Sequence, residues 1–177
     1  MTDFLELAAK RESVRGYTDQ PVEREKLENC IIAAQIAPSA CNSQPWSYIV
    51  VTDKELLPKV TKAVQAYGLN SWADSAQAYI IVVEETAMLM DGKGGRTPNQ
   101  KYAALDIGLS VSQICLEATA QGLGTCIMGS FDGNYLKSFL PIEEEKTIRL
   151  VLSVGYPKNP VPRKKIRKDI DQVAKFL

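Results

Sequence analysis

A short basic segment near the N-terminus combines residue types and a spacing that suit a phosphate group. In "KRESVRGY", Arg11, Ser13 and Arg15 occupy alternating positions. Because alternating side chains of an extended backbone point to one side, two guanidinium groups and one hydroxyl would face the same ligand. Arginine binds phosphate through paired hydrogen bonds. The alternative is a solvated basic turn after a helix, since so short a pattern has little specificity by itself.

A second basic segment lies near the other end of the chain. Its cations are Arg163, Lys164, Lys165, Arg167 and Lys168. A run of this kind is usually a solvated surface or a loose contact with an anion. Prolines at positions 157, 160 and 162 stiffen the chain ahead of it. The segment could therefore close over the same phosphate as the first one.

The run "APSACNSQPW" (residues 37–46) gathers polar side chains into one loop, just before the apolar run "SYIVV". A connector that meets only solvent does not need so many amides and hydroxyls. We therefore interpret the loop as a binding surface for a flat ligand with polar edges. The residues concerned are Pro38, Ser39, Asn42, Ser43, Gln44 and Pro45.

The chain has no histidine, which restricts the chemistry that it can perform. Ser-His-Asp and Cys-His nucleophiles and His-ligated zinc sites are excluded. Cys41, in the polar loop, lacks a histidine that could activate it. The four cysteines also lack the spacing of a metal site, so we predict no metal. Any chemistry must use few acid–base groups or be carried by a cofactor.

Two glycine-containing runs do not match nucleotide-binding motifs. In "GLGTCIMG" the glycines follow a predicted helix and precede a strand, which reverses the order of the dinucleotide fingerprint. Gly122 is better explained as the residue that ends the helix. "DGKGGR" lacks the glycine spacing and the Lys-Ser/Thr pair of a P-loop.

Composition indicates one folded domain of ordinary character. The 177 residues are 45% apolar and 24% charged, and Lys+Arg and Asp+Glu are both 21. This balance disfavours general nucleic-acid binding, which needs a basic surface. We expect no signal peptide, no membrane span and reduced thiols, hence a cytoplasmic protein.

Apolar periodicity and capping residues predict interleaved helices and strands in a single α/β or α+β domain. The helix at residues 100–121 is apolar on nearly all sides, so it must be buried or shared between subunits. The glycine-rich run at residues 90–100 predicts a mobile loop, which could act as a lid. Further helices are expected at 3–10, 23–36, 53–65 and 132–139, and strands at 47–52, 78–84, 124–130 and 147–157.

Taken together, these stretches resemble the nitroreductase family of FMN-dependent oxidoreductases. The resemblance runs over nearly the whole chain, in the order "RESVRGY", "APSACNSQPWSYIVV", "DIGLSVSQICLEATAQGLGTCIMGSFD", "LVLSVGYP" and a basic tail. It implies an α+β fold with a central, mainly antiparallel sheet wrapped by helices. It also implies an intertwined homodimer that binds FMN at its interface.

The resemblance assigns roles to particular residues. Arg11, Ser13, Arg15, Arg163 and Lys165 would hold the phosphate and ribityl chain of one FMN. From the other subunit, Pro38, Ser39 and Asn42 would meet the flavin, and Gln44 would shape their loop. The backbone of Ile127, Met128 and Gly129 would face the ring near N5, and Asn70 would read its pyrimidine edge.

The implied reaction is a ping-pong transfer of hydride from NADH or NADPH, through FMN, to a nitroaromatic, quinone or enone acceptor. Such chemistry needs no histidine, because the cofactor carries it. Three alternatives stay open. They are an FMN enzyme of a dehalogenating or flavin-modifying subgroup, a flavin-binding module without turnover, and a basic-tailed protein that binds anionic partners.

Overall fold

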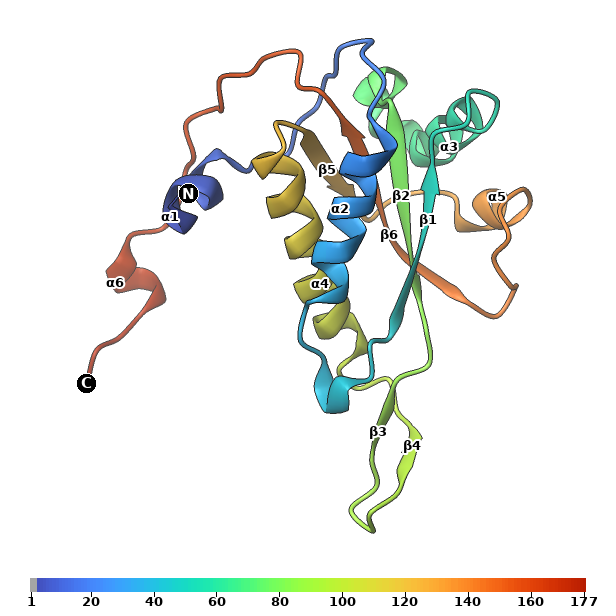
Figure 1. Ribbon diagram of the computed structural model, residues 1–177, viewed down its shortest axis with the longest axis vertical. Helices are drawn as coiled ribbons and strands as arrows, with labels where there is room; N and C mark the ends of the chain where they lie inside the picture. Colours follow the sequence, from blue (N-terminus) through green and yellow to red (C-terminus); the bar gives the residue numbers. More distant parts are fainter. Residues whose placement is uncertain (1–2) are drawn as a thin grey trace.

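The computed structural model describes residues 3–177 and contains one four-stranded sheet that is antiparallel throughout (Figure 1). Its strands lie in the order β1-β2-β6-β5. Their bounds are Trp46–Val51 for β1, Ala78–Glu84 for β2, Thr147–Gly155 for β6 and Gly124–Met128 for β5. The predicted α+β fold with a mainly antiparallel sheet is confirmed.

The two central strands are covered on both faces, which explains their continuous apolar sequences. Every residue of β2 is buried. Ile80 and Val82 pack into the core on one face, whereas Tyr79 and Ile81 pack into the core on the other. This division follows the two-residue repeat of a strand.

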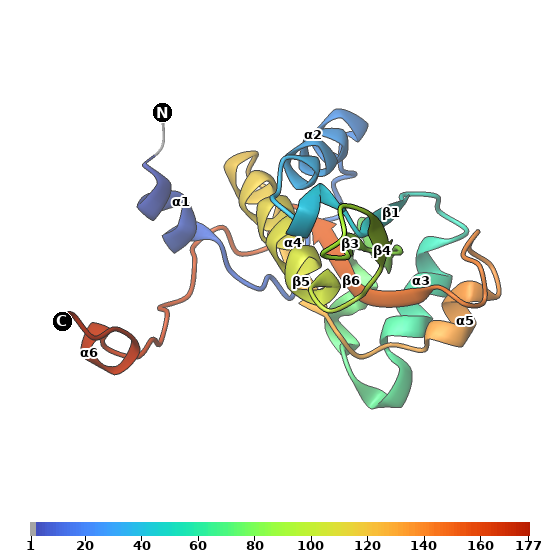
Figure 2. The same cartoon turned by 90° about the horizontal axis from the view of Figure 1, so that it is seen from below.

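Helices form a layer on each face of the sheet (Figure 2). α2 (Arg24–Gln35) and α4 (Ala103–Ala120) cover one face, and α3 (Leu57–Val64) and α5 (Gly133–Lys137) cover the other. Gly122 follows α4 with φ of +79°, and the next amide donates to Ala118 O, as expected of a helix-ending glycine. Asp53 accepts bonds from the amides of Glu55 and Leu56, so it caps a turn and the helix begins later than predicted.

The loop predicted at residues 90–100 is only partly irregular. Its glycine-rich part, residues 91–95, is the turn of a hairpin whose strands are β3 (Met88–Met90) and β4 (Arg96–Pro98), and this hairpin projects from the end of the sheet (Figure 1). The Asp91 side chain accepts hydrogen bonds from the amides of Lys93 and Gly95, which closes the turn. Pairing between strands of only three residues each was not visible in the local pattern.

Both chain ends lie on one side of the molecule, away from the sheet (Figures 1 and 2). α1 (Phe4–Lys10) precedes the first basic segment, and α6 (Ile170–Val173) lies in the tail. The described part of the chain also contains three short 3₁₀ turns, η1 (Ala40–Asn42), η2 (Ala66–Gly68) and η3 (Ser71–Ser75). Within residues 3–177, no helix combines the length and the hydropathy needed to cross a membrane.

Candidate functional site

The two basic segments, far apart in sequence, line one cavity of about 340 Å³. Arg11, Ser13 and Arg15 line it from the N-terminal segment, and Arg163 and Lys165 line it from the tail. Among the described residues, the cavity wall holds six basic side chains and one acidic side chain. Such a concentration of guanidinium and ammonium groups suits a phosphate dianion.

The N-terminal segment is held extended against β5. Ser13 bridges to Thr125 as a parallel partner, and the Val14 amide donates to Thr125 O at 2.9 Å. A Cβ atom on Gly124 would lie 2.5 Å from Val14 Cγ2, so only glycine allows this approach. Gly124 is therefore a positioning residue that sequence reasoning missed. The sequence feature that could have revealed this role is the Gly122-x-Gly124 pair at the start of the predicted strand.

Tyr17 holds the same N-terminal segment against β6. Its hydroxyl bonds to Ser153 Oγ at 2.8 Å and donates to Val14 O at 3.0 Å. Burial raises the pKa of Tyr17 far above its ordinary value, so the phenol keeps its proton. A Cβ atom on Gly155 would lie 2.8 Å from the Tyr17 ring, which shows how closely the ring packs on β6. Sequence reasoning missed this role as well.

The tail is tied to the N-terminal segment by specific contacts. The Arg163 guanidinium donates to Ser13 O at 2.7 Å and to a Glu12 carboxylate oxygen at 3.0 Å. Lys165 Nζ donates to Ala9 O. Glu12, which was not among the predicted residues, thus orients Arg163. These bonds close the cavity on the tail side.

β5, which contacts the cavity-lining Ser13 through Thr125, leads to an exposed C-terminal end. Ile127 is 43% exposed and Gly129 is exposed, whereas Met128 is buried. The Asn70 amide group donates to Val64 O at 2.8 Å and to Ser130 O at 3.4 Å, which places Asn70 beside this strand end. At about 3.3 Å per residue, the Thr125 contact with Ser13 and the position of Gly129 are roughly 13 Å apart. The arrangement suits an elongated ligand with a phosphate at one end.

The polar loop lies elsewhere in the same chain. Its Ala40 amide donates to Asp106 in the first turn of α4, whereas the two basic segments lie nearer the other end of that helix (Figure 1). The Gln44 amide donates to Ser39 Oγ at 2.9 Å, and Gln44 Nε2 lies 3.3 Å from both Asn42 O and Asn42 Oδ1. One chain therefore does not bring the loop, with Pro38, Ser39 and Asn42, to the basic cavity.

The three buried thiols are not activated as nucleophiles. Burial raises the pKa of Cys126 and outweighs the opposing effects of Arg15 and Ser13. Burial likewise raises the pKa of Cys115, and it raises that of Cys30 to about 12. These groups stay protonated at neutral pH, because each thiolate would lose its hydration.

Comparison with known families identifies the fold. The family model described as "Nitroreductase family" matches residues 8–67 and 58–156, which is well over half of the chain. The chain belongs to the nitroreductase family. The residues that form the cavity wall on the N-terminal side and the whole of β5 fall within the match.

Several proteins are similar to this chain over most of its length. An Archaeoglobus fulgidus protein named as an NADH dehydrogenase/NAD(P)H nitroreductase is 31% identical, over 90% of this chain and 88% of its own length. The FMN reductase [NAD(P)H] of Bacillus subtilis is 30% identical, over 76% of this chain and 57% of its own. Iodotyrosine deiodinase 1 of Rattus norvegicus is 25% identical, over 97% of this chain and 68% of its own length.

A solved structure confirms the family architecture. The crystal structure of a nitroreductase family protein from Streptococcus pneumoniae TIGR4 superposes with a TM-score of 0.83 and 28% identity. It covers 99% of this chain and 100% of the other. This chain therefore shares its overall fold with a solved member of the family.

Proposed function

We propose that this chain is an FMN-dependent oxidoreductase that takes hydride from NADH or NADPH and reduces a nitroaromatic, quinone or enone acceptor. The observation that carries the proposal is the basic cavity joined through β5 to an exposed strand end. Family membership and the relatives that are named for FMN and NAD(P)H support it.

The residues around the cavity fit the phosphate end of FMN. Arg11, Arg15 and Lys165 supply charge, the Ser13 hydroxyl supplies a further donor, and Arg163 links the tail to the wall. A glycine at position 124 and a buried tyrosine at position 17 hold the wall in place before any ligand arrives. Preformed, charge-assisted donors of this kind bind phosphate tightly because little order is lost on binding.

The strand end fits the ring of the same cofactor. The backbone of Ile127, Met128 and Gly129 would lie along the ring, and the absence of a side chain at Gly129 leaves its backbone accessible. Since Asn70 donates both bonds of its amide nitrogen to backbone carbonyls, its Oδ1 atom is left to accept from the N–H of the pyrimidine edge. When bound, FMN supplies the redox chemistry, because its ring can accept and return a hydride.

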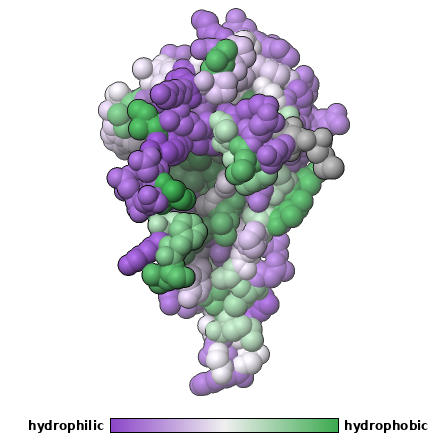
Figure 3. All heavy atoms as spheres, turned by 90° about the vertical axis from the view of Figure 1, so that its left-hand side faces the viewer, coloured by the Kyte–Doolittle hydropathy of each residue, from purple (hydrophilic) through white to green (hydrophobic). Residues whose placement is uncertain are grey.

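The proposal includes a homodimer, because the polar loop cannot reach the cavity of its own chain. α4 turns an apolar face outward, with Leu105 67% exposed and Leu109 47% exposed. The two chain ends also expose apolar side chains, among them Phe4, Ile166 and Phe176. Figure 3 views this side of the molecule and shows hydrophobic surface around a hollow at its centre. A second copy seated here would bury this surface and would bring Pro38, Ser39 and Asn42 to the flavin.

A second candidate keeps FMN and changes the acceptor. Similarity to iodotyrosine deiodinase 1 over 97% of the chain supports reductive dehalogenation. The β3–β4 hairpin, the segment that could cover a substrate, carries Met88, Leu89 and Met90 but no aromatic clamp within residues 88–98. The proposal therefore favours flat, general acceptors over a halogenated amino acid.

An absorption spectrum tests the proposal directly. The purified protein is expected to show the visible flavin band, or to acquire it with added FMN, and to lose it on anaerobic addition of NADH or NADPH. A band that persists with both reductants would support a flavin-binding module without turnover. A protein that takes up no FMN would contradict the proposed function. A panel of nitroaromatic, quinone, enone and iodotyrosine acceptors then separates the two enzymatic candidates.

A further inference from the structure

The polar loop has a backbone that ordinary residues rarely adopt. Cys41, Asn42 and Gln44 have φ values of +54°, +51° and +48°, and none of them is glycine. Three left-handed residues within four positions persist only where neighbouring contacts hold them. The conformation therefore needs an identifiable restraint.

Bonds inside the loop supply part of that restraint. The amides of Asn42 and Ser43 donate to the carbonyls of Ser39 and Ala40, at 3.0 and 3.1 Å. Gln44 bonds to Ser39 and Asn42. Asn42 and Gln44 are exposed, so water competes for these contacts.

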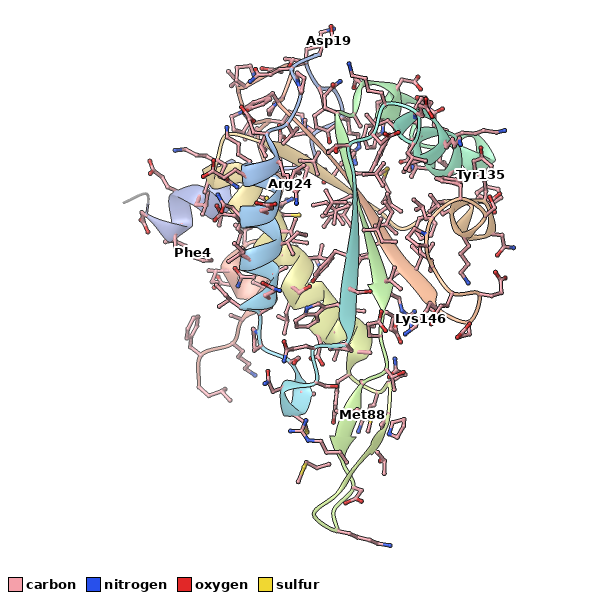
Figure 4. All side chains as sticks on the ribbon, turned by 45° about the vertical axis from the view of Figure 1, so that its right-hand side comes forward. Phe4, Asp19, Arg24, Met88, Tyr135 and Lys146 are labelled. Carbon is pink, nitrogen blue, oxygen red and sulfur yellow. The ribbon has the colours of Figure 1, made fainter. Side chains whose placement is uncertain are left out.

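Two bonds tie the Ser39–Gln44 part of the loop to other elements, and just after it the Glu85 amide donates to Pro45 O at 3.0 Å. The Ala40 amide donates to Asp106 Oδ2 at 3.1 Å, and the Met88 amide donates to Ser43 Oγ at 2.6 Å. Figure 4 shows Met88 at the start of the hairpin, beside the η1 turn. The first bond joins the loop to α4, and the second joins it to β3.

Asp106 is the stronger anchor because of where its carboxylate lies. The residue is only 5% exposed and stands in the first turn of α4, between the buried residues Ala103 and Ile107. A buried carboxylate needs hydrogen-bond donors, and a helix N-terminus favours negative charge. The Ala40 amide is the donor that the described residues offer to this side chain. Loop and carboxylate therefore hold each other in place.

We propose that Asp106 is a positioning residue that holds the Ser39–Gln44 loop in its left-handed shape, so that Ser39 and Asn42 are already arranged when they meet the flavin of the partner subunit. The inference rests on the proposed function for the last step, the contact with flavin. The anchoring of the loop is a property of this chain alone and can be measured without cofactor.

The first test is hydrogen exchange on the cofactor-free protein. Asp106→Ala is expected to speed exchange about tenfold in a peptide covering residues 38–46, while β2 and β6 keep their protection. Asp106→Asn retains an acceptor oxygen and is expected to restore slow exchange. Glu117→Ala removes a carboxylate from the same helix, away from the loop, and serves as the matched control. Unchanged exchange in the loop, or faster exchange throughout the sheet, would overturn the positioning role.

The second test is FMN affinity, measured by the quenching of FMN fluorescence on titration with cofactor-free protein. Asp106→Ala is expected to weaken binding about 10- to 100-fold, the effect of losing a hydrogen bond to a charged group, and Asp106→Asn far less. A loosened loop with unaltered FMN affinity would overturn the proposal. If the wild-type protein bound no FMN, the proposed function would fail, whereas the exchange result would still decide the anchoring.

Ala40→Pro tests the same bond from the loop side. Proline has no N–H to donate, and Ser39 already has the extended backbone that a residue before proline needs (φ −144°, ψ 154°). The substitution leaves α4 unaltered, so it remains usable if Asp106→Ala does not fold. It is expected to weaken FMN binding, and combination with Asp106→Ala is expected to add no further loss, because both remove one bond. Fully additive losses would overturn the inference.

Discussion

Arg163 Nη2 donates a hydrogen bond to the backbone oxygen of Ser13 at 2.7 Å, across 150 residues of sequence. This bond joins the two ends of the chain into one cavity wall. A carboxylate oxygen of Glu12 accepts a hydrogen bond from Arg163 Nε at 3.0 Å, so two bonds orient the guanidinium group. The proposed phosphate site therefore exists only when the tail is docked.

Arg11→Ala is expected to weaken FMN binding by about 10- to 100-fold, because it removes a charge-assisted contact worth roughly 1.5–3 kcal/mol. Fluorescence titration of the cofactor-free protein measures the change. Arg24→Ala is the matched control, since Arg24 lies on α2, pairs with Glu28 and stays 91% exposed. Equal affinity in the two variants would remove Arg11 from the phosphate site.

Asn42→Ala is expected to impair flavin binding in the partner subunit's site and not in the site that its own Arg11 lines. Mixed dimers of Arg11→Ala and Asn42→Ala protomers test this arrangement. If the loop acts across the interface, such a dimer has one site with both defects and one intact site, so about half of the tight FMN binding returns. No recovery would mean that both residues serve the same site within one chain.

Gly124→Ala is expected to destabilise the fold by about 1–3 kcal/mol, the usual cost of overpacking. The new Cβ atom would lie 2.5 Å from Val14 Cγ2 and would push the Arg11–Arg15 segment off β5. Urea unfolding measures the stability, and FMN titration reports the displaced cavity wall. Adding Val14→Ala should recover much of both, and its failure to do so would show that Val14 is not the obstructing group.

Two ion pairs at the base of the hairpin predict a loss of stability in acid. Burial raises the pKa of Glu84, but hydrogen bonds from Arg149 and Gln100 outweigh it and hold the pKa below its ordinary value. Glu85, paired with Lys146, shows the same net lowering of its pKa. Figure 4 shows Lys146 at this end of the sheet, above the hairpin.

The sign of the pH effect follows from these lowered values. A carboxylate whose pKa is lowered by folding stabilises the protein above the unfolded pKa of about 4.3, and this contribution disappears as pH falls through the folded pKa. Glu84→Gln is expected to lower stability at pH 7 by about 1–2 kcal/mol and to flatten the acid-side decline. Urea unfolding at pH 7 and at successively lower pH measures both. An unaltered slope would show that Glu84 does not contribute.

Local sequence was sufficient to predict most of the elements. The unbroken apolar run of β2, the periodicity of α2 and α4 and the glycine after α4 act over a few residues, so their effects were visible in the chain. The absence of histidine also directed the interpretation to cofactor chemistry. The resemblance to a family then supplied the roles of individual residues, which local patterns could not.

Tertiary structure decided what depends on contacts between distant segments. The β3–β4 hairpin needed pairing partners that three-residue strands do not reveal, and the cavity needed Arg163 to meet Ser13. Asp106 was simply one acid in an apolar helix until the fold brought the Ala40 amide to it. Capping and periodicity are local, whereas bringing Arg163 to Ser13 across 150 residues of sequence depends on the whole core. For this reason the sequence by itself determined most of the elements and the chemistry of their residues, and only the fold determined the β3–β4 pairing and which residues share a site.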